Sequence, residues 1–586
     1  MMRDGRASKS ASPLSQSLRP CLFALTSAAL ISGIINCLFL IGPLFMMEVY
    51  DRVLPSKSLP TLVVLFSIVM ALYACQGLLD MFRSRVLSRV GALVDASVSR
   101  AAFATIISSS LRRNRDDAMH QPIQDLDQIR TFLGGPCPGA LFDLPWMPLY
   151  LAICFSFHVW IGLAAVGGAL ALLLLTLLTD LLSRKSAWDA SVNAAMRSHI
   201  AIATRRGAEV IRALGMEQQM SKLWATKNSA FVASQLRLSD VASGFGAMSK
   251  VIRMALQSGV LALGALLIIK GEVSAGTILA SSILVSRALA PVEISIANWR
   301  NFVSARQSWA NLNRALTAEQ GAAVTMSLPR PVKNLTVTNI AVAPPNSDKP
   351  TIHGVDFMLD AGTALAIIGP SAAGKTSLAR TLVGVWSPLR GAVRLDGALL
   401  QHFDAQALGR HIGYLPQDIE LFTGSIAENI ARFNPDATAA DIIEAARAAD
   451  VHDMIQHLPG GYKTQIGDAG AVLSSGQRQR IGLARALYGN PFLVVLDEPN
   501  SNLDAEGEAA LTRAILSIRN RKGIAVVIAH RASALAACDM VLMIANGRAQ
   551  MMARKDDVVR LVRPEPVASD DTPQEAIVMA AAETAL

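Results

Sequence analysis

Hydrophobic residues gather in long runs between about residues 20 and 300, and six runs are long enough to cross a bilayer, which takes about 20 apolar residues. The predicted spans are 21–48, 59–80, 138–156, 158–182, 250–270 and 274–296. The third is the least hydrophobic and contains Pro145 and Pro148, but an even number of spans is needed to place the basic amino end and the second half of the chain on the same side. The first run is too long for a signal-peptide core, so it predicts a retained membrane helix.

The connections between these spans differ strongly in length and charge. The short ones are Asp51–Ser58, the segment around Lys270–Ala275 and the turn near His158. The long ones, 81–137 and 183–249, are rich in Arg and Lys and have helical periodicity, which predicts a cytoplasmic location. We therefore expect the second and fourth spans to continue as helices well beyond the bilayer, with bends at Asn114–Gln124 and Leu214–Met220.

Several ionisable residues fall within the predicted spans, among them Asp143, Arg253, Arg287 and Glu293. Such groups are costly in hydrocarbon, so they either face the interior of the helix bundle or sit near the membrane surface. For Asp143 and Arg253 we favour the surface, with the spans displaced by a turn. For Arg287 and Glu293, deep in the last span, we favour the interior.

After residue 333 the pattern changes to short apolar strands separated by helical stretches, which is typical of a soluble α/β domain. The predicted domains are a cytoplasmic segment 1–20, a membrane domain 21–317 with long cytoplasmic extensions, a linker 318–332, an α/β domain 333–562 and a disordered tail 563–586. The predicted fold class is thus a polytopic α-helical membrane domain fused to an α/β domain.

Composition supports this division. Hydrophobic residues make up 52% of the chain and charged residues 17%, too apolar a mixture for an ordinary soluble protein. The net charge of +9 comes mainly from Lys and Arg beside the apolar runs, so it indicates membrane orientation rather than binding of nucleic acid. The six cysteines are far apart and show neither a disulfide framework nor metal-site spacing.

A phosphate-binding loop stands at the start of the α/β domain. Residues 369–376 read GPSAAGKT, which fits G-x-x-x-x-G-K-[ST], with an apolar strand before the loop and a helical run after it. The backbone N–H groups of such a loop hold phosphate, its Lys reaches the β- and γ-phosphates, and its Thr hydroxyl binds Mg²⁺. The candidate nucleotide ligands are Gly369, Pro370, Ser371, Ala372, Ala373, Gly374, Lys375, Thr376 and Ser377.

A pair of acidic residues completes a hydrolytic site. Asp497 and Glu498 follow the all-apolar run Phe492–Leu496, so they emerge at the carboxyl end of a buried parallel strand, where open α/β sheets bind ligands. We expect Asp497 to hold Mg²⁺ together with Thr376. The adjacent Glu498 would orient and polarise the attacking water.

Two further residues follow apolar strands of the same domain. Gln417 comes after Ile412–Pro416 and is expected to sense the metal ion and the γ-phosphate. His530 comes after Ile524–Ile528, and a lone histidine is often only a structural group. Its place at the carboxyl end of a strand favours a position on the γ-phosphate side.

The segment before the acidic pair predicts a capped helix. Ser474 and Gln477 have the spacing of a capping box, and the helix should run to Leu487 before Gly489-Asn490-Pro491 stops it. A helix amino terminus attracts anions, but its own strand cannot supply a phosphate there.

These motifs resemble the ATP-binding cassette family. The matching segments are GPSAAGKTS, LPQ at 415–417, LSSGQ at 473–477, LVVLDEP at 493–499, SNLD at 501–504 and AH at 529–530. The resemblance implies ATP and Mg²⁺ as ligands and a dimer with two ATP molecules between its cassettes, most simply a homodimer, although a heterodimer is open. The resemblance also implies that the γ-phosphate bound by a second protomer is contacted by the segment Ser474, Ser475, Gly476 and Gln477. It implies that Asp504 links the two sites and that His530 is the switch residue.

This sequence departs from the family pattern at three places. Ala372 stands in the phosphate loop where glycine is usual, and Ser475 replaces the first glycine of the signature. The region before the loop reads Val342-Ala-Pro-Pro345 and lacks the aromatic ring that usually stacks on adenine. Neither of the two glycine replacements removes a catalytic group.

The membrane half resembles the type I protein-secretion exporters of the alkaline-protease/lipase class. The matching segments are YDRVLPS at 50–56, DLPW at 143–146, RALAPVE at 287–293, RLDGA at 394–398 and DEPNSNLD at 497–504. The resemblance implies an exporter of unfolded polypeptides in the bacterial inner membrane, working with a membrane-fusion protein and an outer-membrane channel. Only about 20 residues precede the first span, which disfavours exporters that cleave leader peptides. The alternative is an exporter of lipid, glycan or small hydrophobic molecules with the same ATP-driven engine.

Overall fold

The structure is a computed structural model that describes residues 14, 18–111, 121–320, 328–345, 347, 349–467, 470, 472–501, 503–529 and 535–562. The chain divides into two compact units, Met1–Gly321 and Ala322–Leu586. This division falls within the predicted linker 318–332. The predicted tail 563–586 and most of the predicted segment 1–20 lie outside the described residues.

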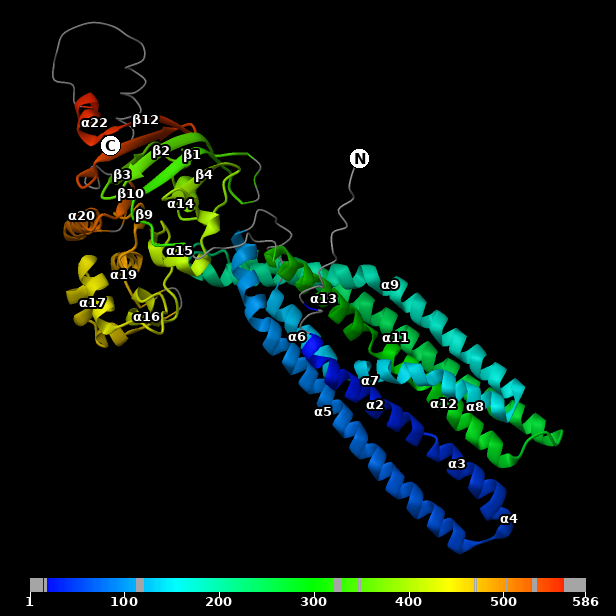
Figure 1. The fold of residues 1–586 in the computed structure, drawn as a ribbon. Helices are drawn as coiled ribbons and strands as arrows, with labels where there is room; N and C mark the ends of the chain where they lie inside the picture. Colours follow the sequence, from blue (N-terminus) through cyan, green and yellow to red (C-terminus); the bar gives the residue numbers. More distant parts are fainter. Residues whose placement is uncertain are drawn as a thin grey trace, which may run out of the picture. The chain divides into compact units, whose positions relative to one another are not determined.

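The described part of the first unit is entirely helical (Figure 1). Its α-helices are α2 (Leu22–Leu38), α3 (Ile41–Glu48), α4 (Leu54–Ser56), α5 (Leu59–Leu111), α6 (Pro122–Leu133), α7 (Pro136–Asp143), α8 (Met147–Phe157), α9 (Val159–Arg206), α10 (Ala208–Ala213), α11 (Glu217–Ile269), α12 (Ala275–Ala297) and α13 (Trp299–Gln320). Six helical segments of the described chain are long and apolar enough to cross a membrane: Arg19–Ser56, Leu59–Ser109, Pro136–Phe157, Val159–Arg206, Glu217–Ile269 and Ala275–Ala297. The predicted six-span membrane domain is confirmed.

Three helices are much longer than a bilayer is thick. α5 and α11 have 53 residues each and α9 has 48. At 1.5 Å per residue such helices reach about 70–80 Å, against about 30 Å of hydrocarbon. They therefore extend beyond the membrane, as predicted. The chain turns between α10 and α11 through Gly215, which has a positive φ of 64°, whereas most of the other predicted bend, Asn114–Gln124, lies outside the described residues.

The third span is interrupted where its prolines predict. α7 ends at Asp143, a short 3-10 turn covers Leu144–Trp146, and α8 begins at Met147. The Asp143 carboxylate accepts hydrogen bonds from Arg83 Nη1 at 2.8 Å and Asn36 Nδ2 at 2.7 Å, and its side chain is only 13% exposed. Asp143 is therefore paired with Arg83 of α5 inside the helix bundle, and its expected position near the membrane surface stays a prediction.

Arg253, Glu293 and Arg287 also interact with residues of the same unit. Arg253 of α11 lies 2.7 Å from Glu293 of α12, measured from Nε to Oε2, and donates to Ser286. Arg253 thus has an intramolecular partner, and its expected position near the membrane surface stays a prediction. The Arg287 guanidinium lies over the ring of Phe39, 4.2 Å from its centroid.

The second unit contains the predicted α/β domain. Its main sheet has the order β12-β11-β3-β10-β9-β6, with β12 antiparallel and the other five strands parallel. These strands are β3 (Ala364–Ile368), β6 (Ile412–Leu415), β9 (Leu493–Asp497), β10 (Ile524–Ile528), β11 (Met540–Ala545) and β12 (Arg548–Arg554). Every residue of β3, β9 and β10 is buried, which explains their uninterrupted apolar sequences.

A smaller antiparallel sheet covers one face of the main sheet. It has the order β2-β1-β4-β5 and consists of β1 (Asn334–Val342), β2 (Ile352–Asp360), β4 (Arg390–Leu395) and β5 (Ala398–Leu399), while a two-stranded ribbon pairs β7 (Gly424–Ser425) with β8 (Gln465–Ile466). The helices are α14 (Lys375–Leu382), α15 (Ala405–His411), α16 (Ile426–Ile430), α17 (Ala439–Ala448), α18 (His452–Gln456), α19 (Ser475–Leu487), α20 (Ala505–Asn520) and α22 (Lys555–Val562). One hydrophobic core lies beneath the small sheet, and the other packs against α16, α17, α19 and α20. The carboxyl ends of β3, β6, β9 and β10 meet at one edge of the main sheet, where the candidate residues lie.

Candidate nucleotide-binding and hydrolysis site

The phosphate loop connects β3 to α14 and has the backbone that an anion-binding turn requires. Gly369, Ala372 and Gly374 all have positive φ, at 149°, 64° and 97°. A side chain at Gly369 would collide with the carbonyl oxygen of Ile544, so only glycine fits there. Ala372 tolerates its left-handed conformation at a cost of about 1–2 kcal/mol, which gives a physical reason why glycine is usual at this position.

Lys375 begins α14 and lies across the loop. Its ammonium group donates to the carbonyl oxygens of Gly369 at 2.6 Å and Pro370 at 2.9 Å. The residue is 5% exposed, and burial lowers the pKa of its amine, while Glu498 and Asp497 oppose that shift. The loop therefore fixes a cation beside the backbone N–H groups that would bind phosphate.

Asp497 ends β9 and faces α14. Its Oδ1 accepts a hydrogen bond from Thr376 Oγ1 at 3.4 Å, whereas its buried Oδ2 has no hydrogen-bond partner among the described residues. Burial raises the pKa of Asp497 to about 6, and the hydrogen bond from Thr376 opposes this shift. A buried carboxylate with a free oxygen beside a hydroxyl suits a hard divalent cation, whose charge would compensate the lost hydration. The residues present therefore fit Mg²⁺.

Glu498 makes hydrogen bonds through both its backbone and its side chain. Its N–H donates to the carbonyl oxygen of Ile528 at 3.2 Å, which extends the pairing of β9 with β10 by one residue. It then turns out of the sheet with a positive φ of 51°, a conformation that is unusual for a non-glycine residue and is often found at functional sites. Gln417, two residues beyond β6, donates from Nε2 to Glu498 Oε2 at 3.0 Å. Gln417 and Glu498, both predicted from the sequence to belong to the site, thus lie together at this edge of the sheet.

The predicted capping box is present at the start of α19. Ser474 Oγ accepts from the N–H of Gln477 at 3.2 Å, and Gln477 Oε1 accepts from the N–H of Ser474 at 2.9 Å. Ser475 and Gly476 form the first turn, and the helix ends at Leu487 as expected. Gly489 and Asn490 then take positive φ values and redirect the chain into β9.

A second group of interactions joins α19 to the turn after β9. Asp504 caps α20 by accepting from the N–H of Gly507 at 2.8 Å, and this hydrogen bond lowers the pKa of its carboxyl group. Arg480 of α19 donates to Asp504 Oδ1 at 2.8 Å. Arg480 was not predicted from the sequence, because its contact joins the side of a helix to a turn and no local motif marks it.

One candidate cannot be placed. His530 lies outside the described residues, although β10 ends two residues before it, as the apolar run predicted. The other candidates form two groups. Lys375, Thr376, Asp497, Glu498 and Gln417 surround the phosphate loop, whereas the capped start of α19 and Asp504 are connected through Arg480.

Comparisons with known proteins agree with both units. Residues 352–501 match the family described as ABC transporter, and residues 22–291 match the family described as ABC transporter transmembrane region. The chain is 51% identical to the type I secretion system ATP-binding protein PrsD of Rhizobium meliloti, over 94% of this chain and 95% of that protein. It is 28% identical to the cyclolysin secretion/processing ATP-binding protein CyaB of Bordetella pertussis, over 88% and 73% of the two chains. The leukotoxin translocation ATP-binding protein LktB of Mannheimia haemolytica is 30% identical, over 88% and 74%.

A solved structure supports the fold. It is described as a bacterial Atm1-family ABC exporter with ATP bound, and it superposes with a TM-score of 0.79 at 22% identity, covering 96% of this chain and 98% of that one. Six candidate spans and a complete phosphate loop accompany these similarities in a single chain. The protein is therefore a multi-pass, ATP-binding member of the ABC transporter family, of the kind found in type I secretion systems, and an ATPase coupled to transport.

Proposed function

We propose that this transporter hydrolyses ATP to export unfolded polypeptides through a type I secretion system. The observation that carries the proposal is the 51% identity to a type I secretion ATP-binding protein along 94% of the chain, so both units share the resemblance. The signal by which the polypeptide is recognised would be at its carboxyl end.

The geometry supports a division of roles during hydrolysis. Lys375 and the N–H groups of residues 369–377 would bind the phosphates of ATP. Glu498 would orient and activate the attacking water, since its carboxylate stands free of the sheet and is held by Gln417. His530, which lies outside the described residues, would contact the γ-phosphate as the switch residue that the family resemblance implies.

Mg²⁺ is part of this proposal. Thr376 and Gln417 would hold it together with Asp497, which would bind it through water, and the unpartnered Asp497 Oδ2 supports that assignment. When bound, the ion would neutralise charge on the phosphates.

The second group of residues supports a dimer. Ser474, Ser475, Gly476 and Gln477 form a capped helix start that would bind the γ-phosphate held by a second protomer, with Asp504 and Arg480 linking the two sites. A homodimer is the simplest arrangement. We place it in the bacterial inner membrane, with a membrane-fusion protein and an outer-membrane channel as partners.

The shared site can be tested with two inactive variants. Lys375→Ala damages the phosphate loop, and Ser474→Arg damages the helix start. Co-expressed chains should form mixed dimers with one intact composite site, restoring up to about a quarter of wild-type ATPase, because about half of the dimers are mixed and each has one of two sites. If no mixing ratio restores ATPase activity, the sites are not shared between chains.

The function itself can be tested by deleting the gene and comparing secreted proteins with those of the parent strain. We expect one or more polypeptides to disappear from the medium and to return with the wild-type gene but not with Glu498→Gln. An unchanged set of secreted proteins, together with altered lipid or glycan export, would favour the alternative class of transporter.

A further inference from the structure

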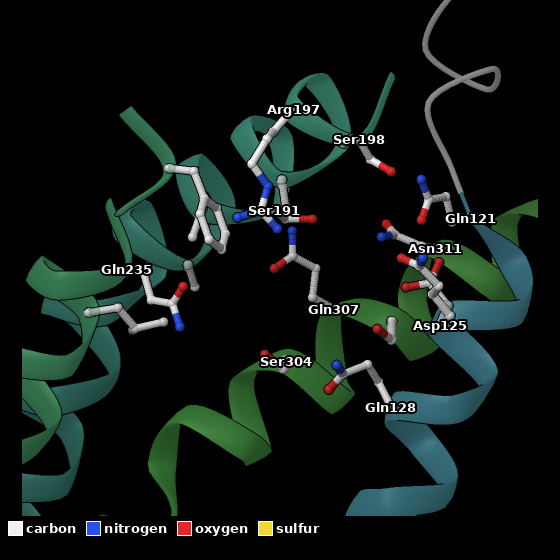
Figure 2. Close-up of a pocket in the computed structure, with 18 of the residues that line it drawn as sticks. Gln121, Asp125, Gln128, Ser191, Arg197, Ser198, Gln235, Ser304, Gln307 and Asn311 are labelled. Carbon is white, nitrogen blue, oxygen red and sulfur yellow. The ribbon is translucent and has the colours of Figure 1, made fainter. Parts of the chain in front are cut away.

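A polar cavity of about 380 Å³ lies within the helical extensions of the membrane unit, between α6, α9, α11 and α13 (Figure 2). This volume falls in the range of roughly 300–1,000 Å³ that is usual for ligand pockets. The parts of α9 and α11 that line it lie outside the predicted spans 158–182 and 250–270, on the side of the long basic connections. The cavity is remote in sequence from every residue of the nucleotide site.

Carboxamide and hydroxyl groups dominate the lining. Six side chains carry a carboxamide: Gln121, Gln124, Gln128, Gln235, Gln307 and Asn311. Each offers both a donor and an acceptor, which matches the paired N–H and C=O of a peptide backbone, whereas phosphate oxygens or lipid tails would use only part of this capacity or none. Four serines add further hydroxyl groups: Ser191, Ser198, Ser304 and Ser308.

Gln307 supplies direct evidence of unused binding capacity. It projects from α13 into the middle of the cavity, towards Ser191 and Arg197 of α9 (Figure 2). Its Nε2 is buried and has no hydrogen-bond partner among the described residues. A buried unsatisfied donor destabilises the protein, so a ligand that brings an acceptor gains affinity at this point.

The charge of the cavity favours an acidic ligand. Arg197 lies over the ring of Phe231, 4.1 Å from its centroid, and donates from Nη1 to Asn228 at 3.2 Å, which fixes the guanidinium while leaving other N–H groups for a ligand. Arg300 is a second cation in the lining, and Asp125 is the one acidic residue among the described residues that line the cavity. Asp125 interacts with Ser308, Asn311 and Arg314, so its charge is partly compensated from within.

The shape of one wall suits an extended chain. Apart from Arg197, the α9 residues of this wall are small and recur at helical spacing: Ala187, Ala190, Ser191, Ala194, Ala195 and Ser198. Small side chains let the backbone of a ligand approach the helix closely. Among the described parts of the chain that line the cavity, only Phe231 and Leu238 are large and apolar, which disfavours a lipid or a hydrophobic drug.

We propose that this cavity binds an extended, acidic segment of polypeptide, whose backbone pairs with the carboxamides and whose carboxylate binds Arg197. The segment belongs to the cargo, so this inference rests on the proposed function. It adds a specificity-determining site that is separate from the nucleotide chemistry.

Binding can be measured by fluorescence anisotropy on the detergent-purified full chain. The probe is a labelled short peptide of alternating Ser and Asp, and its comparison is the same peptide with Lys in place of Asp. Arg197→Met should weaken binding of the acidic peptide about tenfold or more, because a hydrogen bond to a charged group contributes a net free energy of this size. Arg197→Lys should weaken the binding less. Gln307→Leu should weaken binding about fivefold without lowering the melting temperature, since it removes an unsatisfied donor.

The matched control is Arg237→Met, which removes one exposed positive charge from α11 outside the cavity and should leave peptide binding unchanged. Equal affinity for the acidic and basic peptides, no binding of either, or wild-type affinity in folded Arg197→Met and Gln307→Leu proteins would overturn the proposal. Should binding fail while deletion of the gene still removes a polypeptide from the medium, the cavity assignment is wrong and the export function stands. An unchanged set of secreted proteins would instead reject the export function.

Discussion

The cassette and the membrane unit place their polar groups in different ways. In the cassette, Thr376, Gln417 and Glu498 all follow or adjoin apolar strands, and the parallel sheet brings the strand ends together. In the membrane unit, Arg83 and Asp143 meet only because two helices pack with a particular rotation and offset. Polar residues that follow parallel strands thus meet at a sheet edge by a general rule. In a helix bundle, which polar residues meet depends on packing that sequence periodicity does not specify.

This difference separates two kinds of function. The cassette has a site that combines a phosphate loop, candidate Mg²⁺ ligands and the carboxylate of Glu498. The membrane unit has a cavity lined by common polar residues, and such a lining can change to suit a cargo without disturbing hydrolysis. We therefore expect variants in the two regions to have separable effects.

The largest separation should come from Glu498→Gln. The substitution keeps the shape and the contact with Gln417 but removes the carboxylate that would activate water, so the ATPase rate should fall by about 10²–10⁴-fold while ATP still binds. ATP binding and turnover can be measured on the same purified protein. The control is Glu506→Gln, an exposed carboxylate on α20 that should leave turnover near wild type. Near-normal hydrolysis by Glu498→Gln would remove Glu498 from the proposed mechanism.

In the membrane unit the largest effect should come from Arg83→Met. It leaves the Asp143 carboxylate buried without its cation, which typically costs about 3–5 kcal/mol. Thermal unfolding of the purified chain should show a marked loss of stability. The double variant Arg83→Met with Asp143→Leu should recover most of it, because no unpaired charge remains. If the double variant is as unstable as Arg83→Met alone, the pair does not act through its charges.

A smaller, pH-dependent effect is expected at Asp125. Burial raises the pKa of Asp125 from its ordinary 3.8 to about 6, against the hydrogen bonds from Ser308 and Asn311 and the charge of Arg314. Because the folded-state pKa is raised, the stabilising contribution is full below 3.8 and is lost as the pH rises through about 6. Asp125→Asn should therefore melt above the wild type at neutral pH and close to it in acid.

The control for this effect is Asp127→Asn, an exposed carboxylate on the same helix. Its melting temperature should differ from that of the wild type by a similar amount at both pH values. A pH-independent difference for Asp125→Asn would show that burial does not govern its ionisation.

The smallest effect is expected at Ala372 in the phosphate loop. Ala372→Gly relieves a left-handed backbone conformation worth about 1–2 kcal/mol, part of which is lost to the greater freedom of glycine in the unfolded chain. The melting temperature should rise slightly or stay level, and ATPase activity should not fall. A clear loss of stability would mean that the alanine methyl group makes contacts that outweigh the strain.

The sequence was a better guide to the cassette than to the membrane unit for physical reasons. The phosphate loop, the strand before Asp497 and the capping box at Ser474 follow from local pattern, and the structure contains all three. The six spans also follow from hydropathy. The Arg83–Asp143 pair, the Arg253–Glu293 pair and the polar cavity depend on which helix faces meet, and periodicity alone does not determine that.

Arg480 marks the limit within the cassette itself. Its partner Asp504 was predicted to matter, but their contact joins the side of a helix to a turn, for which the strand-end rule offers no guide. The same holds for the backbone of Glu498, which has a positive φ and donates a hydrogen bond to Ile528, because neither feature follows from the apolar pattern of the strand. The residue types predicted which side chains belong to the site, and packing determined their conformations and contacts.

The central claim is that ATP hydrolysis at Glu498 drives a polypeptide across the membrane. The most direct measurement uses inside-out membrane vesicles that contain the full chain and its partner proteins, and follows protection of the secreted polypeptide from added protease. We expect the polypeptide to be protected from protease only when ATP is present. This protection should appear with the wild type and Glu506→Gln and be absent with Glu498→Gln. Wild-type vesicles that hydrolyse ATP but leave the polypeptide fully accessible to protease would contradict it.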